Sequence, residues 1–123
     1  MSILRDVSMP DKEFIGRIIE ESLDDNRLVN DLQILKVEIT SAPDPEKRLH
    51  IYSVAADKNE IEKIWIHLKK GGFMHFWKGD NITVYFSGKK FDIFGRYKST
   101  WSSAIEYGKS MGIPEEQLDF PIE

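Results

Sequence analysis

Apolar residues near the N-terminus recur at the spacing of an amphipathic helix. Proline suits an early helical position, and Ser8 and Asp11 stand at the spacing of a capping box, so we expect this helix to begin near Pro10. The apolar face that the spacing predicts consists of Phe14, Ile15, Ile18, Ile19 and Leu23.

The segments that follow alternate with a period of two, which is typical of strands with one solvated face. In residues 32–40, Leu35, Val37 and Ile39 point to one side and polar residues point to the other. A loop with two prolines separates this segment from a second strand at 49–56, and the order predicts a long-looped hairpin.

Apolar residues at helical spacing predict two more helices. The first begins at Asp57, which stands at capping-box spacing from Glu60, and the glycines at 71–72 end it. The second spans about 99–111 and stops at Gly112, and we expect the short tail beyond it to lie across the domain. The apolar positions are Ile61, Ile64, Trp65 and Leu68 in the first helix, Trp101, Ala104, Ile105, Gly108 and Met111 in the second, and Leu118, Phe120 and Ile122 in the tail.

Residues 73–94 predict three strands joined by two tight hairpins. Gly79-Asp80 and Gly88-Lys89 each place glycine first in a two-residue loop, where the favoured turns need a positive φ. Counting from these turns pairs Trp77 with Ile82, His75 with Val84, Phe73 with Phe86, Phe86 with Phe91, and Val84 with Ile93.

This register gives the three strands two unlike faces. One face is almost wholly apolar and must point to the core, whereas the other mixes aromatic, polar and basic side chains. The first holds Phe73, His75, Trp77, Ile82, Val84, Phe86, Phe91 and Ile93, and the second holds Met74, Phe76, Lys78, Thr83, Tyr85, Ser87, Lys90, Asp92 and Phe94.

These elements predict one α+β domain that spans residues 1–123. Its antiparallel sheet has about five strands, and three helices lie on one side of the sheet. The expected order is helix-strand-strand-helix-strand-strand-strand-helix. The 123 residues, of which 41% are hydrophobic and 31% charged, suit one domain with its own core.

Composition narrows the chemistry that this chain can perform. It has no cysteine, which excludes disulfides and thiolate chemistry and fits a reducing, cytoplasmic compartment. No apolar run is long enough for a signal peptide or a membrane span, so we expect no membrane partner. The three histidines, His50, His67 and His75, lack metal-ligand spacing, and no nucleophile motif appears, so we predict no metal, no cofactor and no catalytic residue.

Charge is distributed unevenly along the chain. The net charge is −4, yet residues 69–98 carry seven lysines and arginines against two aspartates. This basic segment coincides with the aromatic strands, which makes their mixed face a candidate binding surface.

The leading hypothesis is a non-enzymatic binding or protein-interaction module. Its ligand- or partner-binding surface would be the mixed face around Phe76, Thr83, Tyr85, Asp92 and Phe94. The partner would be another protein, a second copy of the chain, or a small ligand. A simpler interpretation stays open, in which the first helix, the tail or a second subunit covers the aromatic residues of this face.

Two alternatives from other classes also remain. Single-stranded nucleic acid would stack on the same face and contact nearby cations, although the acidic chain and the central Asp92 count against this. A small enzyme would instead use His75 or His50 as a general base in a pocket beside Tyr85. The cations in the nucleic-acid hypothesis are Lys78, Lys90, Arg96 and Lys98.

Overall fold

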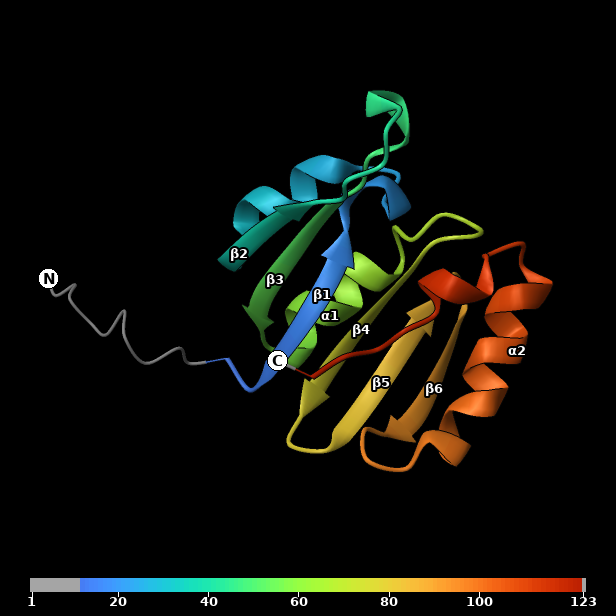
Figure 1. The fold of residues 1–123 in the computed structure, drawn as a ribbon. Coiled ribbons are helices and arrows are strands. Elements are labelled where there is room, and N and C mark those ends of the chain that lie inside the picture. Colours follow the sequence, from blue (N-terminus) through green and yellow to red (C-terminus); the bar gives the residue numbers. More distant parts are fainter. Residues whose placement is uncertain (1–11, 123) are drawn as a thin grey trace, which may run out of the picture.

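One antiparallel sheet of six strands organises the computed structural model, which describes residues 12–122 (Figure 1). The strand order is β2-β3-β1-β4-β5-β6, so β2 and β6 form the edges. The architecture is α+β, as predicted, with one strand more than expected. The strands are β1 (Phe14–Ile19), β2 (Gln33–Ile39), β3 (His50–Ala56), β4 (Phe73–Lys78), β5 (Asn81–Phe86) and β6 (Lys89–Phe94). The α-helices are α1 (Lys58–Trp65) and α2 (Ser102–Ser110), and 3-10 segments span Glu20–Ser22, Asn26–Asp31, Pro45–Lys47, Lys98–Trp101 and Glu115–Gln117.

The segment predicted as the first helix is instead strand β1, near the centre of the sheet. It pairs with β3 on one side and with β4 on the other. A central strand is covered on both faces, so its apolar residues need not alternate, and Phe14, Ile15, Ile18 and Ile19 fit a buried strand as well as a helix. The β-branched isoleucines favour the strand. The expected helix start at residues 8–11 lies outside the described residues.

Gly16 of β1 makes room for an aromatic ring from the neighbouring strand. It is directly paired with Phe76 of β4, whose side chain is fully buried. A Cβ atom at position 16 would overlap the Phe76 ring. Close packing at the centre of the sheet therefore requires glycine at this position.

The β4–β5 hairpin has the register that its sequence predicts. Lys78 pairs with Asn81 across the loop Gly79-Asp80, and Gly79 has a φ of +61°. The predicted pairs of this hairpin, Trp77 with Ile82, His75 with Val84 and Phe73 with Phe86, are confirmed.

The second hairpin turns one residue earlier than predicted. Its loop is Ser87-Gly88, and Gly88 stands second in it with a φ of +77°, as a type II turn requires. The predicted pairs are therefore wrong by two residues, because Val84 pairs with Phe91 and Ile82 with Ile93. A shift of two residues leaves each side chain on its predicted face, so the division into two faces holds.

Helices cover both faces of the sheet, which corrects the expectation that they share one side (Figure 1). Both faces of the inner strands carry apolar side chains, so each face needs a cover. On the first face α2 and the C-terminal segment pack on Phe73, Trp77 and Val84. On the second face α1 packs on Met74 and Phe76.

Helix α1 begins as predicted and ends early. The Asp57 carboxylate accepts the Glu60 backbone N–H at 2.8 Å, and the Glu60 carboxylate accepts the Asp57 N–H at 3.0 Å, which completes the capping box. The helix stops at Trp65 rather than at the glycines, because Leu68 already forms a β-bridge with Leu23.

The C-terminal segment crosses the sheet, as predicted (Figure 1). Helix α2 gives way to it at Gly112, which has a φ of +89°. Leu118 and Phe120 are buried in the same core as α2. The carbonyl oxygen of Pro121 lies 2.9 Å from Nε2 of His75. The segment therefore completes the cover of this face.

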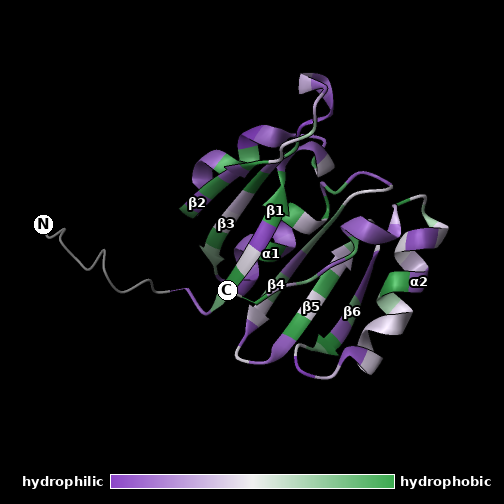
Figure 2. Ribbon diagram, in the orientation of Figure 1, coloured by the Kyte–Doolittle hydropathy of each residue, from purple (hydrophilic) through white to green (hydrophobic). Residues whose placement is uncertain are grey.

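Most of the connecting turns consist of hydrophilic residues, whereas hydrophobic residues recur along the strands, including the edge strand β2 (Figure 2). None of the helices between residues 12 and 122 is long and apolar enough to cross a membrane.

Candidate functional site

Helix α1 covers the aromatic part of the sheet face that the sequence suggested for binding. Phe76 is 1% exposed and Tyr85 is 9% exposed. The Trp65 ring of α1 packs edge-on against the Tyr85 ring, with centroids 5.1 Å apart. Burial raises the pKa of the Tyr85 hydroxyl, and the nearby negative charge of Asp92 acts in the same direction. These two rings belong to the core.

The remaining residues of that face reach the surface near the edge strand β6. The Thr83 hydroxyl donates to the Asp92 carboxylate at 2.8 Å, and Phe94 is 45% exposed. The five residues proposed for binding thus divide into two buried rings and three surface residues, and they do not form one exposed surface. The sequence could not predict this division, because it does not show which aromatic residues of the mixed face are buried.

The cations of the nucleic-acid hypothesis come from the end of β4, from β6, from the turn after β6 and from the start of the 3-10 segment Lys98–Trp101. Each has a partner within the chain. Lys78 contacts Glu13 at 3.1 Å, Arg96 contacts Asp80 at 3.7 Å, Lys90 lies 5.5 Å from the centre of the Trp65 ring, and Lys98 lies 3.8 Å from the centre of the Trp101 ring.

His75 is buried on the face opposite Tyr85, so these two side chains do not line a common pocket. Its ring stacks on Trp77 at 5.3 Å, and Nε2–H donates to the Pro121 carbonyl at 2.9 Å. Burial lowers the pKa of His75 to about 4, and the positive charge of Arg17 acts in the same direction. The imidazole is therefore neutral near pH 7.

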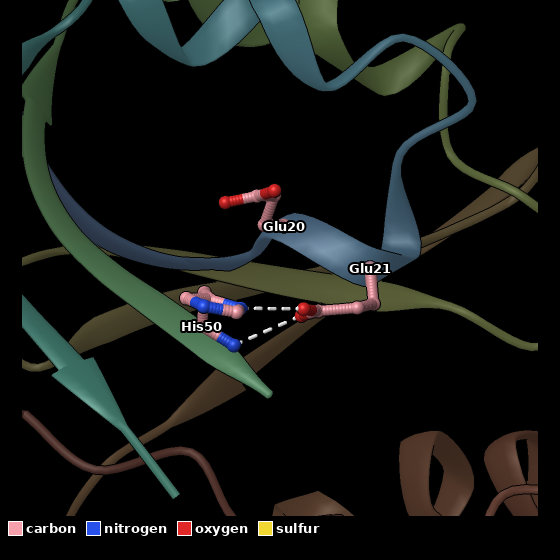
Figure 3. A group of neighbouring side chains, drawn as sticks. All are labelled: Glu20, Glu21 and His50. Atoms are coloured by element: carbon pink, nitrogen blue, oxygen red, sulfur yellow. Dashed lines mark hydrogen bonds and ion pairs between the residues drawn. The ribbon is translucent and has the colours of Figure 1, made fainter. Parts of the chain in front are cut away.

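Glu20, Glu21 and His50 bring metal-ligand atoms within 4.8 Å of one another, where β1 ends and β3 begins (Figure 3). Glu21 accepts both the backbone N–H of His50 at 2.9 Å and its Nδ1–H at 2.7 Å. Glu20 turns away and accepts from the Tyr52 hydroxyl at 2.8 Å and from Asn26 at 2.9 Å. Because both carboxylates already bind protein donors, the cluster fastens this end of β1 to β3.

A hollow of about 150 Å³ opens beside His75, between the sheet and the C-terminal segment. Strands β1, β3 and β4 supply its floor, and residues 117–121 overhang it. Its lining residues are Arg17, Ile19, Ile51, Phe73, His75, Gln117, Asp119 and Pro121. Sequence reasoning missed this hollow, because it depends on where the C-terminal segment crosses the sheet.

The edge strand β2 exposes a row of large apolar side chains. Ile34, Leu35, Val37 and Ile39 are 41%, 50%, 52% and 58% exposed. The sequence predicted that one side of this strand would be buried, and this is wrong. Within residues 12–122, neither core cluster includes a side chain of β2.

The charged residues of β2 lie between these apolar ones. The side chains of Lys36 and Glu38 are 57% and 50% exposed, and their charged atoms lie 3.9 Å apart. Glu38 also contacts Arg17 of β1 at 3.3 Å. The sequence did carry a signal for the inner position of β3, because residues 53–56 include no charged side chain, and all four are buried in the structure.

No family model, curated protein or solved structure matches this chain. Its function must therefore be argued from its own surfaces.

Proposed function

We propose that this chain is a protein-interaction module that pairs with a second copy of itself through the edge strand β2. The observation that carries this proposal is the exposed apolar row on an edge of the sheet. An edge strand leaves alternate backbone N–H and C=O groups without a strand partner, so it is a template for another strand. Pairing would satisfy these groups and remove apolar surface from water.

Symmetry limits how two copies of β2 can pair. Two antiparallel strands related by a two-fold axis place residues of the same face opposite each other, so the axis passes through one residue. An axis at Lys36 or at Glu38 places like charges opposite each other. An axis at Val37 instead places Lys36 of each copy opposite Glu38 of the other, twice in the dimer.

The same register also matches the apolar residues. Val37 meets its own copy on the axis, where two β-branched apolar side chains lie directly opposite each other. The bulge between Ile34 and Lys36 leaves the regular part of the strand, residues 36–39, at the centre of the contact. Charge complementarity and apolar pairing therefore favour one register, which supports a second copy as the partner.

Charge reversal tests this arrangement. Lys36→Glu converts two favourable cross-strand pairs into two repulsive ones, a change of about 1 kcal/mol for each pair. The sum of about 2 kcal/mol should weaken the dimer roughly 30-fold. Adding Glu38→Lys restores opposite charges in the predicted register and should recover much of the affinity. Sedimentation equilibrium over a range of protein concentrations measures these dissociation constants.

Lys47→Glu is the matched control, because it makes the same charge change in the exposed 3-10 turn between β2 and β3. It should leave the dissociation constant unchanged. Thermal melts of all variants show that each one folds. A wild-type chain that stays monomeric at every concentration would overturn the proposal, as would a double variant no tighter than Lys36→Glu.

A further inference from the structure

A second hollow, of about 200 Å³, lies next to the one beside His75 and shares Ile19, Phe73 and Gln117 with it. It is lined by residues from the end of β1, from the 3-10 segment that follows β1, and from the loop between α1 and β4. Ile19, Leu49 and Phe73 contribute apolar surface, and the loop contributes polar groups. This combination of an apolar body with a few polar groups is typical of small-molecule sites.

Two neighbouring lysines, Lys69 and Lys70, line this second hollow. Both are exposed, and within residues 12–122 neither ammonium group forms a hydrogen bond or an ion pair. Gly71 lines the hollow with backbone atoms alone, and its N–H also has no acceptor in the described part of the chain. The loop therefore offers two positive charges and one backbone donor to a ligand.

Ser22 adds a buried hydroxyl group to the same lining. The residue is 7% exposed, and its Oγ accepts the Phe73 N–H at 3.3 Å. No group between residues 12 and 122 accepts the proton of this hydroxyl. A serine hydroxyl is a donor as well as an acceptor, and a buried donor without an acceptor is costly. An acceptor bound in the hollow would therefore stabilise this group.

Glu21 also lines the second hollow, but its carboxylate already has partners. It accepts the backbone N–H of His50 at 2.9 Å and the ring Nδ1–H at 2.7 Å. The hydrogen bond to Glu21 raises the pKa of His50, so the imidazolium that offsets the carboxylate charge persists to higher pH. With Glu21 held in this pair, the two lysines dominate the charge of the hollow.

These groups favour a dianion over a monoanion. Two ammonium groups match the double charge of a phosphate group, whose three terminal oxygens also accept from a hydroxyl and a backbone N–H. A carboxylate brings one charge and two oxygens. Inorganic phosphate brings the charge but makes no use of the apolar side of the hollow.

We infer that this second hollow binds an organic phosphate, a phosphate monoester with a small apolar body. The phosphate contacts Lys69, Lys70 and Ser22, and the apolar body lies on Ile19 and Phe73. An apolar cavity of about 150 Å³ accepts benzene, so about 200 Å³, continued by the neighbouring hollow, has room for both parts. No residue of β2 is among those that line it, so the inference is independent of β2 pairing.

Phenyl phosphate tests the inference by NMR chemical-shift titration of the whole chain at about pH 7.5, where a phosphate monoester carries nearly two charges. It should shift the amide signals of residues 69–73 in a saturable way. Inorganic phosphate lacks the apolar body, and phenylacetate carries a single charge. Each should bind about tenfold more weakly, because it loses either the apolar contact or part of the charge interaction.

Lys69→Gln combined with Lys70→Gln removes both positive charges and should weaken phenyl phosphate binding about tenfold. The matched control is Lys58→Gln with Lys63→Gln, which changes the net charge equally at two exposed lysines of α1 outside the hollow. It should leave the dissociation constant unchanged. Ser22→Ala, shown to fold by thermal melting, should also weaken binding about tenfold, because the phosphate loses a donor.

The inference fails if phenyl phosphate shows no saturable binding or shifts only signals outside the hollow. It also fails if the Lys69 and Lys70 double variant binds as tightly as its control, or if a folded Ser22→Ala chain binds as tightly as the wild type. Phenylacetate or inorganic phosphate that binds as tightly as phenyl phosphate would overturn the choice of an organic phosphate.

Discussion

The buried ring of His75 gives this fold a defined sensitivity to acid. Burial lowers its pKa from 6.5 to about 4, because removal from water disfavours the imidazolium form. The positive charge of Arg17 adds to the lowering, while the Pro121 carbonyl and the Asp119 carboxylate act against it. Lowering the pH should therefore reduce the free energy of unfolding.

The sign follows from proton counting. Between about pH 6.5 and pH 4 the unfolded chain binds a proton at His75 that the folded chain excludes. The stability that neutral His75 allows is therefore fully present above pH 6.5, and it is lost as the pH falls toward 4. At 1.36 kcal/mol per pH unit, the interval from 6.5 to about 4 amounts to about 3 kcal/mol.

Urea unfolding of the wild type and of His75→Gln, at about pH 7.5 and about pH 3.5, isolates this effect. Glutamine keeps a donor that can reach the Pro121 carbonyl, but it does not titrate. Other titrating groups are common to both proteins and cancel in the comparison. The stability advantage of the wild type over the variant should shrink by about 3 kcal/mol at the lower pH. An advantage that is equal at the two pH values would refute the reasoning.

Three further predictions test local features of the fold. Gly16→Ala should cost about 1 to 3 kcal/mol in urea unfolding, because its methyl group overlaps the Phe76 ring, and Phe76→Leu in the same chain should recover part of the loss. Asp57→Ala should cost about 1 kcal/mol in the same assay, because α1 loses its capping box. Glu21→Gln should lower the pKa of His50 in an NMR titration, because the hydrogen bond that the His50 ring donates to the Glu21 carboxylate raises that pKa. An unchanged His50 titration would contradict this assignment.

The sequence predicts local features correctly where one or two neighbouring residues determine the backbone conformation. The capping box at Asp57 and Glu60, the turn at Gly79 and the helix stop at Gly112 all lie where the sequence predicts them. Each needs only a short-range hydrogen bond or a positive φ. These features place α1, the β4–β5 hairpin and the end of α2.

Features that depend on contacts between distant parts of the chain could not be predicted from the sequence. The apolar spacing of residues 14–19 fits both a helix and a buried central strand, and the pairing with β3 and β4 makes the segment a strand. Phe76 and Tyr85 look like surface aromatics until α1 is placed beneath them. The exposure of β2 and the hollow at Arg17 likewise depend on strand order and on the path of the C-terminal segment.

Cross-linking at the two-fold axis tests the central claim most directly. The chain has no cysteine, so Val37→Cys introduces a single thiol at the position that should meet its own copy. Residues directly opposite in antiparallel strands have Cβ atoms about 4.5–5.5 Å apart, which mild oxidation can close into a disulfide with small adjustments. We predict rapid formation of a covalent dimer, slowed by Lys36→Glu and recovered when Glu38→Lys is added. A Val37→Cys chain that cross-links no faster than the exposed control Lys47→Cys would contradict pairing through β2.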